Sequence, residues 1–184
     1  FNVVFNSIYT TSTSGLYRVI DIPYVSTTNG VSHFLSFDGC SINNGAMGLA
    51  INSYYSAGYL GASTNLNINN CRFTNQSSYG ISAGSIIGIK IRNCRISTIS
   101  TNSNYIGISL NWIMIITDDN RPLVIGNTIT GAVGGAGIQW YALGVKSSFT
   151  ANRRPLIANN MISIGTGTST TKGLYASVTY NSIG

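Results

Sequence analysis

Apolar and polar positions along the chain repeat in a six-residue pattern: an apolar residue, any residue, a residue at a turn, Asn or Cys, any residue, and a second apolar residue. The fourth position of the seven copies is occupied by Asn6, Cys40, Cys71, Cys94, Asn127, Asn160 and Asn181. Successive copies are therefore 34, 31, 23, 33, 33 and 21 residues apart. Repeats of this length are typical of solenoids, in which each unit buries its apolar face against its neighbours.

Each copy predicts two short strands joined by a sharp bend. Apolar residues alternate up to the third position and then shift by one, so the backbone must turn there. Five of the seven residues at this position are Gly or Asn, which enter the left-handed backbone region at the lowest cost. After the bend, the Asn or Cys is expected to point inward and to begin the second strand.

A third strand is predicted between consecutive copies, where Gly is followed by Leu or Ile. This pair occurs at Gly15-Leu16, Gly48-Leu49, Gly80-Ile81, Gly107-Ile108, Gly137-Ile138 and Gly173-Leu174. Three short strands per coil predict an all-β fold, a parallel β-helix (solenoid) of about six to seven coils. In such a stack we expect the inward Asn side chains to form a ladder, because hydrogen bonds between coils would satisfy buried amides that are otherwise costly.

This order of strand, bend, Asn ladder and strand resembles the right-handed parallel β-helix of the pectin-lyase-like superfamily over essentially the whole chain. The superfamily includes polysaccharide lyases, glycoside hydrolases, phage tailspikes and long bacterial surface proteins, so the resemblance implies a fold and leaves several functions open. The stretches Asn-Ser-Ile, at 181–183, and Gly-Leu-Tyr-Ala, at 173–176, are also similar to repeat regions of large secreted bacterial surface proteins, including those exported by the type nine secretion route.

Composition favours an exported protein. Charged residues make up only 8% of the 184 residues and Glu is absent, so solubility depends on Ser, Thr, Asn and Gly. The apolar runs are strand-sized, and membrane insertion is not expected. We expect residues 1–184 to be one β-helix segment of a longer chain that lacks its caps, because the first and last copies of the pattern lie at its two ends.

The three cysteines share one position of the repeat. Cys40, Cys71 and Cys94 stand in three successive copies where the other copies carry Asn. We interpret them as buried thiols that fill the same stack. A disulfide between neighbouring coils is the alternative, because one coil step lies within the Cα separation that a bridge requires. With one histidine and no CxxC pair, the sequence predicts no metal site and no cofactor.

The net charge of +6 suggests an acidic partner. Lys90, Arg92 and Arg95 fall in one repeat, and Arg72 holds the position of Arg95 one coil earlier. Arg72 and Arg95 are therefore expected side by side on the outer surface, as a site for acidic glycans or other cell-surface components. The alternative is a solvated face that prevents aggregation. We expect no nucleic acid partner, because aromatic residues are not interleaved with these cations.

A glycan-cleaving site would need clustered carboxylates, and the chain has four acids, Asp21, Asp38, Asp118 and Asp119. Asp118 and Asp119, with Arg121 close by, are the best candidates. In the hydrolases that the chain resembles, a pair of Asp residues is accompanied by Gly-His-Gly and Arg-x-Lys elements, and neither is found here. The Asp-Asp-Asn-Arg-Pro string is also an ordinary turn sequence before a strand. We therefore assign no catalytic residue.

In the enzymes that the chain resembles, the active site lies along the strand that here begins with Gly-Leu or Gly-Ile. The outward residues of this strand are expected to include Ala50, Ser82, Ser109, Gln139 and Tyr175. None of these is a carboxylate. Trp140 is expected to point into the core together with Ile138, because the two share one parity.

Tyr54, Tyr55 and Tyr59 cluster in a long loop. Flat amphipathic rings on a loop can stack on sugars or on a protein partner, and packing within the loop is the alternative. Together these observations favour a structural or adhesin-like β-helical scaffold of a secreted or cell-surface bacterial protein, which packs against neighbouring coils of its parent chain and contacts glycans through its loops. Two other functions stay open: a segment of a polysaccharide lyase or hydrolase, and a phage-type receptor-binding fibre.

Overall fold

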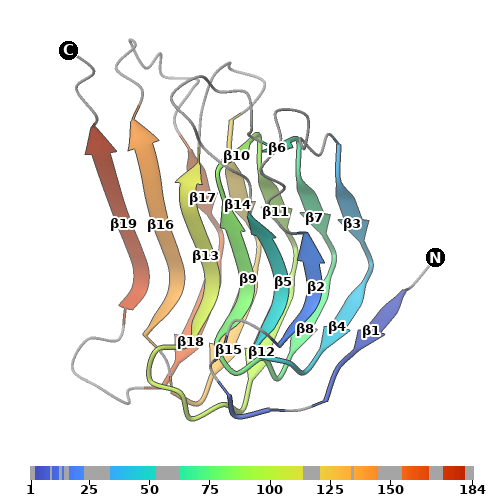
Figure 1. The fold of residues 1–184 in the computed structure, drawn as a ribbon. Coiled ribbons are helices and arrows are strands. Elements are labelled where there is room, and N and C mark those ends of the chain that lie inside the picture. The colour runs from blue at the N-terminus through green and yellow to red at the C-terminus, as the bar shows by residue number, and fades with distance from the viewer. Residues whose placement is uncertain are drawn as a thin grey trace.

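The computed structural model describes residues 3–8, 10–12, 14, 17–22, 34–52, 63–113, 121–133, 135–144, 155–165 and 172–180. In these residues most of the strands belong to three parallel sheets, which the chain visits in turn as it winds from coil to coil (Figure 1). The chain is therefore an all-β parallel β-helix, and the predicted fold class is confirmed.

Two of the sheets flank the bend of the six-residue pattern. The entry sheet, before the bend, contains β3 (Ser36–Asp38), β7 (Asn67–Asn69), β11 (Lys90–Arg92), β14 (Leu123–Ile125) and β17 (Leu156–Ala158). The exit sheet, after the bend, contains β1 (Val4–Asn6), β4 (Ser41–Asn43), β8 (Arg72–Thr74), β12 (Arg95–Thr98), β15 (Thr128–Gly131) and β18 (Met161–Ile164).

The third sheet, here called the long sheet, carries the strands predicted from the Gly-Leu and Gly-Ile pairs. It contains β2 (Arg18–Ile22), β5 (Met47–Asn52), β9 (Tyr79–Gly84), β13 (Ile106–Ile113), β16 (Ala136–Gly144) and β19 (Lys172–Tyr180). A small two-stranded sheet of β6 (Ser63–Thr64) and β10 (Ile86–Ile87) adds a fourth side to two of the coils. In Figure 1 the long sheet forms one layer and the entry sheet lies behind it.

The bends between the entry and exit sheets adopt the conformation that the sequence predicts. All five bend residues in the described coils have a positive φ, between 52° and 69°: Gly39, Asn70, Asn93, Gly126 and Asn159. Gly and Asn tolerate this left-handed conformation better than other residues do. The shift in apolar parity at the third position of the pattern is therefore a single left-handed residue that turns the chain from one sheet into the next.

The first coil is shifted relative to the prediction. In β1, Phe5 pairs with Ile42 and Asn6 pairs with Asn43. Asn6 is therefore three residues past the position that Cys40 holds in the next coil, and it is exposed. Its Oδ1 accepts a hydrogen bond from Asn43 Nδ2 at 2.7 Å on the outer surface. The assignment of Asn6 to the ladder is wrong, because the packing of Phe5 against the core sets the register of this strand.

The first strand of the long sheet is displaced in the same way. In β2, Ile20 pairs with Leu49, so Val19 and Ile20 hold the position that Gly-Leu or Gly-Ile holds in later coils. The pair predicted for this position, at 15–16, lies outside the described residues. Both errors fall in the first coil, where the described chain has no earlier coil to set its register.

The core consists of apolar side chains stacked in rows between the sheets. In the exit sheet, Ile42, Phe73, Ile96 and Ile129 are direct neighbours in successive coils, and all four are fully buried. Trp140 is only 2% exposed, which confirms its predicted inward direction. In the described part of the chain, no helix has the length and apolar character that crossing a membrane requires.

The glycine of the Gly-Leu or Gly-Ile pair has a steric cause. Gly48, Gly80, Gly107 and Gly137 are stacked in the long sheet, and a Cβ on any of them would lie 2.6–2.7 Å from the carbonyl oxygen of the next glycine in the row. It would also lie less than 3.0 Å from an inward side chain of the exit sheet, such as Ile129 Cγ2 at 2.5 Å from Gly107. The close approach of the two sheets therefore requires glycine at this position.

We predict that Gly107→Ala lowers the free energy of unfolding by about 1–3 kcal/mol, the usual cost of forcing extra volume into a packed core. Urea denaturation of the variant and the parent chain measures this difference. Gly173→Ala is the matched control, because Gly173 holds the same repeat position and a Cβ there would meet nothing within 4 Å. An equal loss of stability in both variants would contradict the steric explanation.

Candidate functional site

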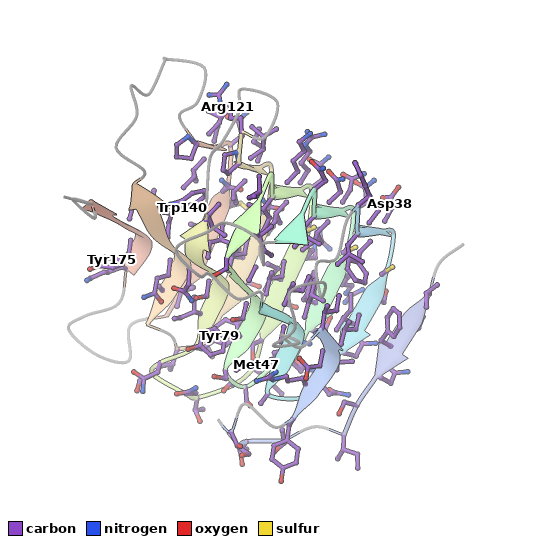
Figure 2. The ribbon with its side chains drawn as sticks, turned by 45° about the horizontal axis from the view of Figure 1, so that its top comes forward. Asp38, Met47, Tyr79, Arg121, Trp140 and Tyr175 are labelled. Carbon is purple, nitrogen blue, oxygen red and sulfur yellow. The ribbon has the colours of Figure 1, made fainter. Side chains whose placement is uncertain are left out.

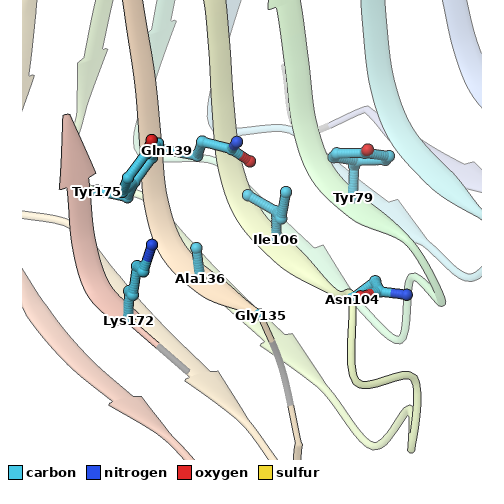
Figure 3. A pocket seen from close by; sticks show the side chains of 8 residues that line it. All are labelled: Tyr79, Asn104, Ile106, Gly135, Ala136, Gln139, Lys172 and Tyr175. Atoms are coloured by element: carbon cyan, nitrogen blue, oxygen red, sulfur yellow. The ribbon is translucent and has the colours of Figure 1, made fainter. Parts of the chain in front are cut away.

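An open pocket of about 430 Å³ lies on the outer face of the long sheet (Figure 3). It is lined by residues of β9, β13, β16 and β19 and of the turns before them: Tyr79, Asn104, Ile106, Gly135, Ala136, Gln139, Lys172 and Tyr175. The pocket is thus built on strands from four successive coils.

The hollow follows from side-chain size along one row of the sheet. Tyr79, Ile106, Ala136 and Lys172 are direct neighbours across the four strands. The short side chain of Ala136 and the adjacent Gly135 leave space between the larger neighbours. Since adjacent strands are about 4.8 Å apart, Tyr79 and Lys172 begin about 14 Å from each other. They form opposite ends of the pocket.

Polar groups lie at the walls of this hollow. Gln139 is a direct neighbour of Tyr175 in a second outward row. Lys172 Nζ lies 4.0 Å from the centroid of the Tyr175 ring, a cation–π contact that holds the ammonium group against this wall. Asn104 lies in the turn before β13, where its backbone N–H donates to Asn102 Oδ1 at 3.0 Å. The pocket therefore offers aromatic rings, side-chain amides and one cation.

Sequence reasoning finds this pocket only in part. Gln139 and Tyr175 are among the predicted outward residues, and Ser82 and Ser109 lie in the same row. The repeat pattern alone assigns no role to Tyr79 or Lys172. The signal that could have found them is their position, because each directly precedes the glycine of its repeat, and a Cβ on Gly80 would point inward against Ile96 of the exit sheet.

The second outward row also contains a carboxylate that the prediction left out. Asp21 pairs with Ala50 at one end of the row, because β2 is shifted relative to its predicted position. Its Oδ1 accepts a hydrogen bond from an Arg18 guanidinium nitrogen at 2.7 Å, and the two form an ion pair. Asp21 lies four strands from Gln139, about 19 Å away, and takes no part in the pocket.

Several predicted site residues lie outside the described residues: Tyr54, Tyr55, Tyr59, Asp118, Asp119 and Asn181. Their roles stay predictions. Arg121 is described and half-buried just before β14, and Figure 2 places it and Asp38 away from Tyr79. Among the residues that the structure describes, no group of three His, Cys, Asp or Glu side chains could hold a metal ion.

The Asn side chains of the inward row connect each coil to the coil before it. Asn127 Nδ2 donates to the carbonyl of Ile91 at 3.1 Å, and its Oδ1 accepts from the backbone N–H of Cys94 at 2.9 Å. Asn160 repeats this arrangement one coil later, donating to Val124 at 2.8 Å and accepting from the Asn127 N–H at 3.0 Å. Asn127 Nδ2 also donates to Asn160 Oδ1 at 2.9 Å. The two amides therefore form a ladder.

The cysteines continue the same row. Cys94 Sγ donates to the carbonyl of Ile68 at 3.7 Å and Cys71 Sγ to that of Phe37 at 3.4 Å, the positions that the Asn amides reach in later coils. All three cysteines are buried and free. A hydrogen bond with Cys71, together with burial, raises the pKa of the Cys94 thiol. The same hydrogen bond lowers the pKa of Cys71 to about 7.

Exposed arginines gather where the entry sheet bends into the exit sheet. Arg72 and Arg95 are direct neighbours across β8 and β12, as the repeat predicts, and both are exposed. Arg92 ends β11 three residues before Arg95 and is also exposed. Lys90, at the start of β11, is half-buried on the same outer face. The structure thus brings the four predicted cations together on two successive coils.

Comparisons with known proteins found no matching family model, no matching curated protein and no matching solved structure. The function is therefore inferred from the geometry of the pocket and of the arginines, together with the sequence resemblance.

We predict that Asn127→Leu lowers the free energy of unfolding by about 1–3 kcal/mol, because the Cys94 N–H and the Ile91 carbonyl would each lose a partner in the core. Thermal or urea unfolding provides the measurement. Asn67→Leu is the control, since Asn67 faces outward between the buried Leu66 and Ile68. We expect the control to change stability by less than about 0.5 kcal/mol. Similar losses in the two variants would argue against the ladder.

Proposed function

We propose that the chain is part of an adhesin-like β-helical scaffold of a secreted or cell-surface bacterial protein, and that it binds a saccharide in the pocket of the long sheet. The pocket is the observation that carries the proposal. It combines the Tyr79 ring, the Tyr175 ring with Lys172, and the amides of Gln139 and Asn104 on one open surface.

The chemistry of these groups suits a sugar. Aromatic rings such as those of Tyr79 and Tyr175 stack on the apolar faces of sugar rings, and side-chain amides exchange hydrogen bonds with hydroxyl groups. The Lys172 ammonium group can donate to a ring hydroxyl or to an acidic substituent. Because the pocket is open along the sheet, it can accept one stretch of a longer glycan as well as a free end.

The scaffold supports this site by keeping its residues in place. Most of the pocket residues lie on strands whose registers are set by stacked rows in the core, and sites on strands hold their geometry better than sites on loops. This differs from the contact through loops that the tyrosine cluster at 54–59 suggests. Glycan binding by the face of a sheet does not depend on that cluster.

Export and superfamily are further parts of the proposal. A charged fraction of 8% and the absence of Glu suit a β-rich exported protein whose surface depends on Ser, Thr and Asn. Three parallel sheets and an Asn ladder support membership of the pectin-lyase-like superfamily. The similarity of the repeat wording to large bacterial surface proteins supports export by the type nine route.

We predict that Tyr79→Ala weakens saccharide binding about tenfold or more, as expected when an aromatic side chain that stacks on a sugar ring is removed. An oligosaccharide array identifies a binding sugar, and titration calorimetry then compares the variants. Tyr17→Ala is the control, because Tyr17 is an exposed tyrosine outside the pocket. Unchanged binding by Tyr79→Ala would remove the pocket from the proposal.

We further predict that the segment does not cleave glycans. The two described carboxylates, Asp21 and Asp38, lie on different sheets, and each already accepts hydrogen bonds from neighbouring side chains. The measurement is incubation with acidic and neutral polysaccharides, with and without calcium, followed by assay for new reducing or unsaturated ends. Cleavage that disappears in Asp118→Ala or Asp119→Ala would instead identify a lyase or hydrolase segment.

A further inference from the structure

We propose that Cys71 and Cys94 form a buried binding site for a single copper(I) ion, held between their two sulfur atoms inside the β-helix. The site lies on the inward row of the repeat and shares no residue with the pocket of the long sheet. The proposal therefore goes beyond the proposed function and does not depend on saccharide binding.

The strand register places the two cysteines directly over each other. Arg72 and Arg95, which directly follow them, are paired across β8 and β12. The Arg95 N–H donates to the Cys71 carbonyl at 2.9 Å, which fixes the two coils in this register. Cys71 is 1% exposed, Cys94 is 2% exposed, and both are free thiols. Two soft ligands thus face the same apolar interior, one coil apart.

The spacing of one coil suits a metal ion better than a disulfide. In parallel strands that are in register, equivalent atoms, including Cβ, are about 4.8 Å apart. A disulfide usually requires Cβ atoms that are about 3.5–4.5 Å apart. Two metal–thiolate bonds of about 2.3 Å placed in line span about 4.6 Å between the sulfur atoms. Cys71 and Cys94 can therefore hold one ion between them with little movement of the backbone.

The ligands indicate which ion fits. Thiolates are soft ligands that favour copper(I), and this ion accepts two of them in a linear arrangement. Among the described residues, no group of three His, Cys, Asp or Glu side chains could build the four-coordinate site that zinc prefers. On binding, each thiol releases its proton and each sulfur donates one electron pair to the metal, which stays copper(I). Two protons leave for one ion bound.

The arginines at the bend offset the charge of the loaded site. One copper(I) ion with two thiolates carries a net negative charge, which is costly to bury without a compensating charge nearby. Positive side chains directly follow Cys71 and Cys94 in the chain, and another comes two residues before Cys94: Arg72, Arg95 and Arg92. Their attraction lowers the cost of placing the anionic complex in this gap.

The third cysteine lies at the end of the row that is nearest to solvent. Cys40 is 7% exposed, and Val3, which lies over it in the first coil, is 43% exposed. An ion from solvent would meet Cys40 before it meets Cys71. Asp38, however, holds in this coil the position that Arg92 holds two coils later. A negative complex is therefore favoured in the inner gap, between Cys71 and Cys94, over the outer gap beside Cys40.

Asparagine provides matched variants for this site. In the next two coils, Asn127 and Asn160 hold the same position of the row and reach the equivalent carbonyls at 3.1 and 2.8 Å. The sulfurs of Cys71 and Cys94 reach theirs at 3.4 and 3.7 Å. Replacing either cysteine with Asn therefore removes a sulfur and leaves a side chain that the row already accepts.

The test adds copper(I), kept reduced by ascorbate under nitrogen, to the reduced chain in competition with a chromophoric copper(I) chelator. We expect one ion per chain. Cys71→Asn should raise the dissociation constant at least about hundredfold, and Cys94→Asn at least about tenfold, because Cys94→Asn leaves the outer gap intact. Cys40→Asn is the control and should change the constant less than about threefold. Circular dichroism checks that each variant is folded.

X-ray absorption of the loaded parent chain tests the site without any substitution. We expect two sulfur neighbours around copper and three free thiols again once the metal is removed. The proposal is overturned if the parent chain binds no copper(I), if nitrogen or oxygen atoms surround the metal, or if two thiols are lost to a disulfide. It is also overturned if folded Cys71→Asn binds as tightly as the parent, or if Cys40→Asn weakens binding as much as Cys94→Asn does.

Discussion

The stacking of coils in register is the constraint on which this structure depends. Each position of the repeat lies directly over the same position of the neighbouring coil, about 4.8 Å away, so a side chain must suit the equivalent residues on both sides of it. Inside, this requirement gives the row of glycines from Gly48 to Gly137 and the row of large apolar side chains that packs against it. On the outer surface the requirement is weaker, because side chains can extend into solvent. There the rows differ from coil to coil and could acquire binding functions.

The entry and exit strands could be predicted because their signals are local. A left-handed residue such as Asn93 and the inward residue after it stand within one six-residue pattern, and every described coil from the second onward keeps that order. The first coil could not be placed in this way. In a strand of three residues, apolar spacing allows more than one register. Packing against the next coil makes Phe5 the inward residue of this strand, in place of Asn6.

The two surfaces differ in how far the sequence reveals them. Arg72 and Arg95 could be predicted as neighbours because each directly follows a cysteine of the inward row. The pocket could not be predicted, because its depth depends on the relative sizes of Tyr79, Ala136 and Lys172. These residues lie far apart in the chain, and only the strand register shows that they belong to one row. Asn and Cys share the inward row for a related reason: both side chains supply a donor that reaches the equivalent carbonyl of the preceding coil.

The ladder also has a direction, and this bears on how the molecule is made. Asn127 donates to and accepts from backbone groups of the coil before its own, and Asn160 does the same to backbone groups in the coil of Asn127. The buried backbone groups at one bend are thus satisfied by a side chain that comes about one repeat later in the chain. On a ribosome, a coil that has just emerged would be left with open hydrogen bonds until its successor is synthesised. The coils would then form in order from the N-terminus, and each new coil would complete the hydrogen bonds of the coil before it.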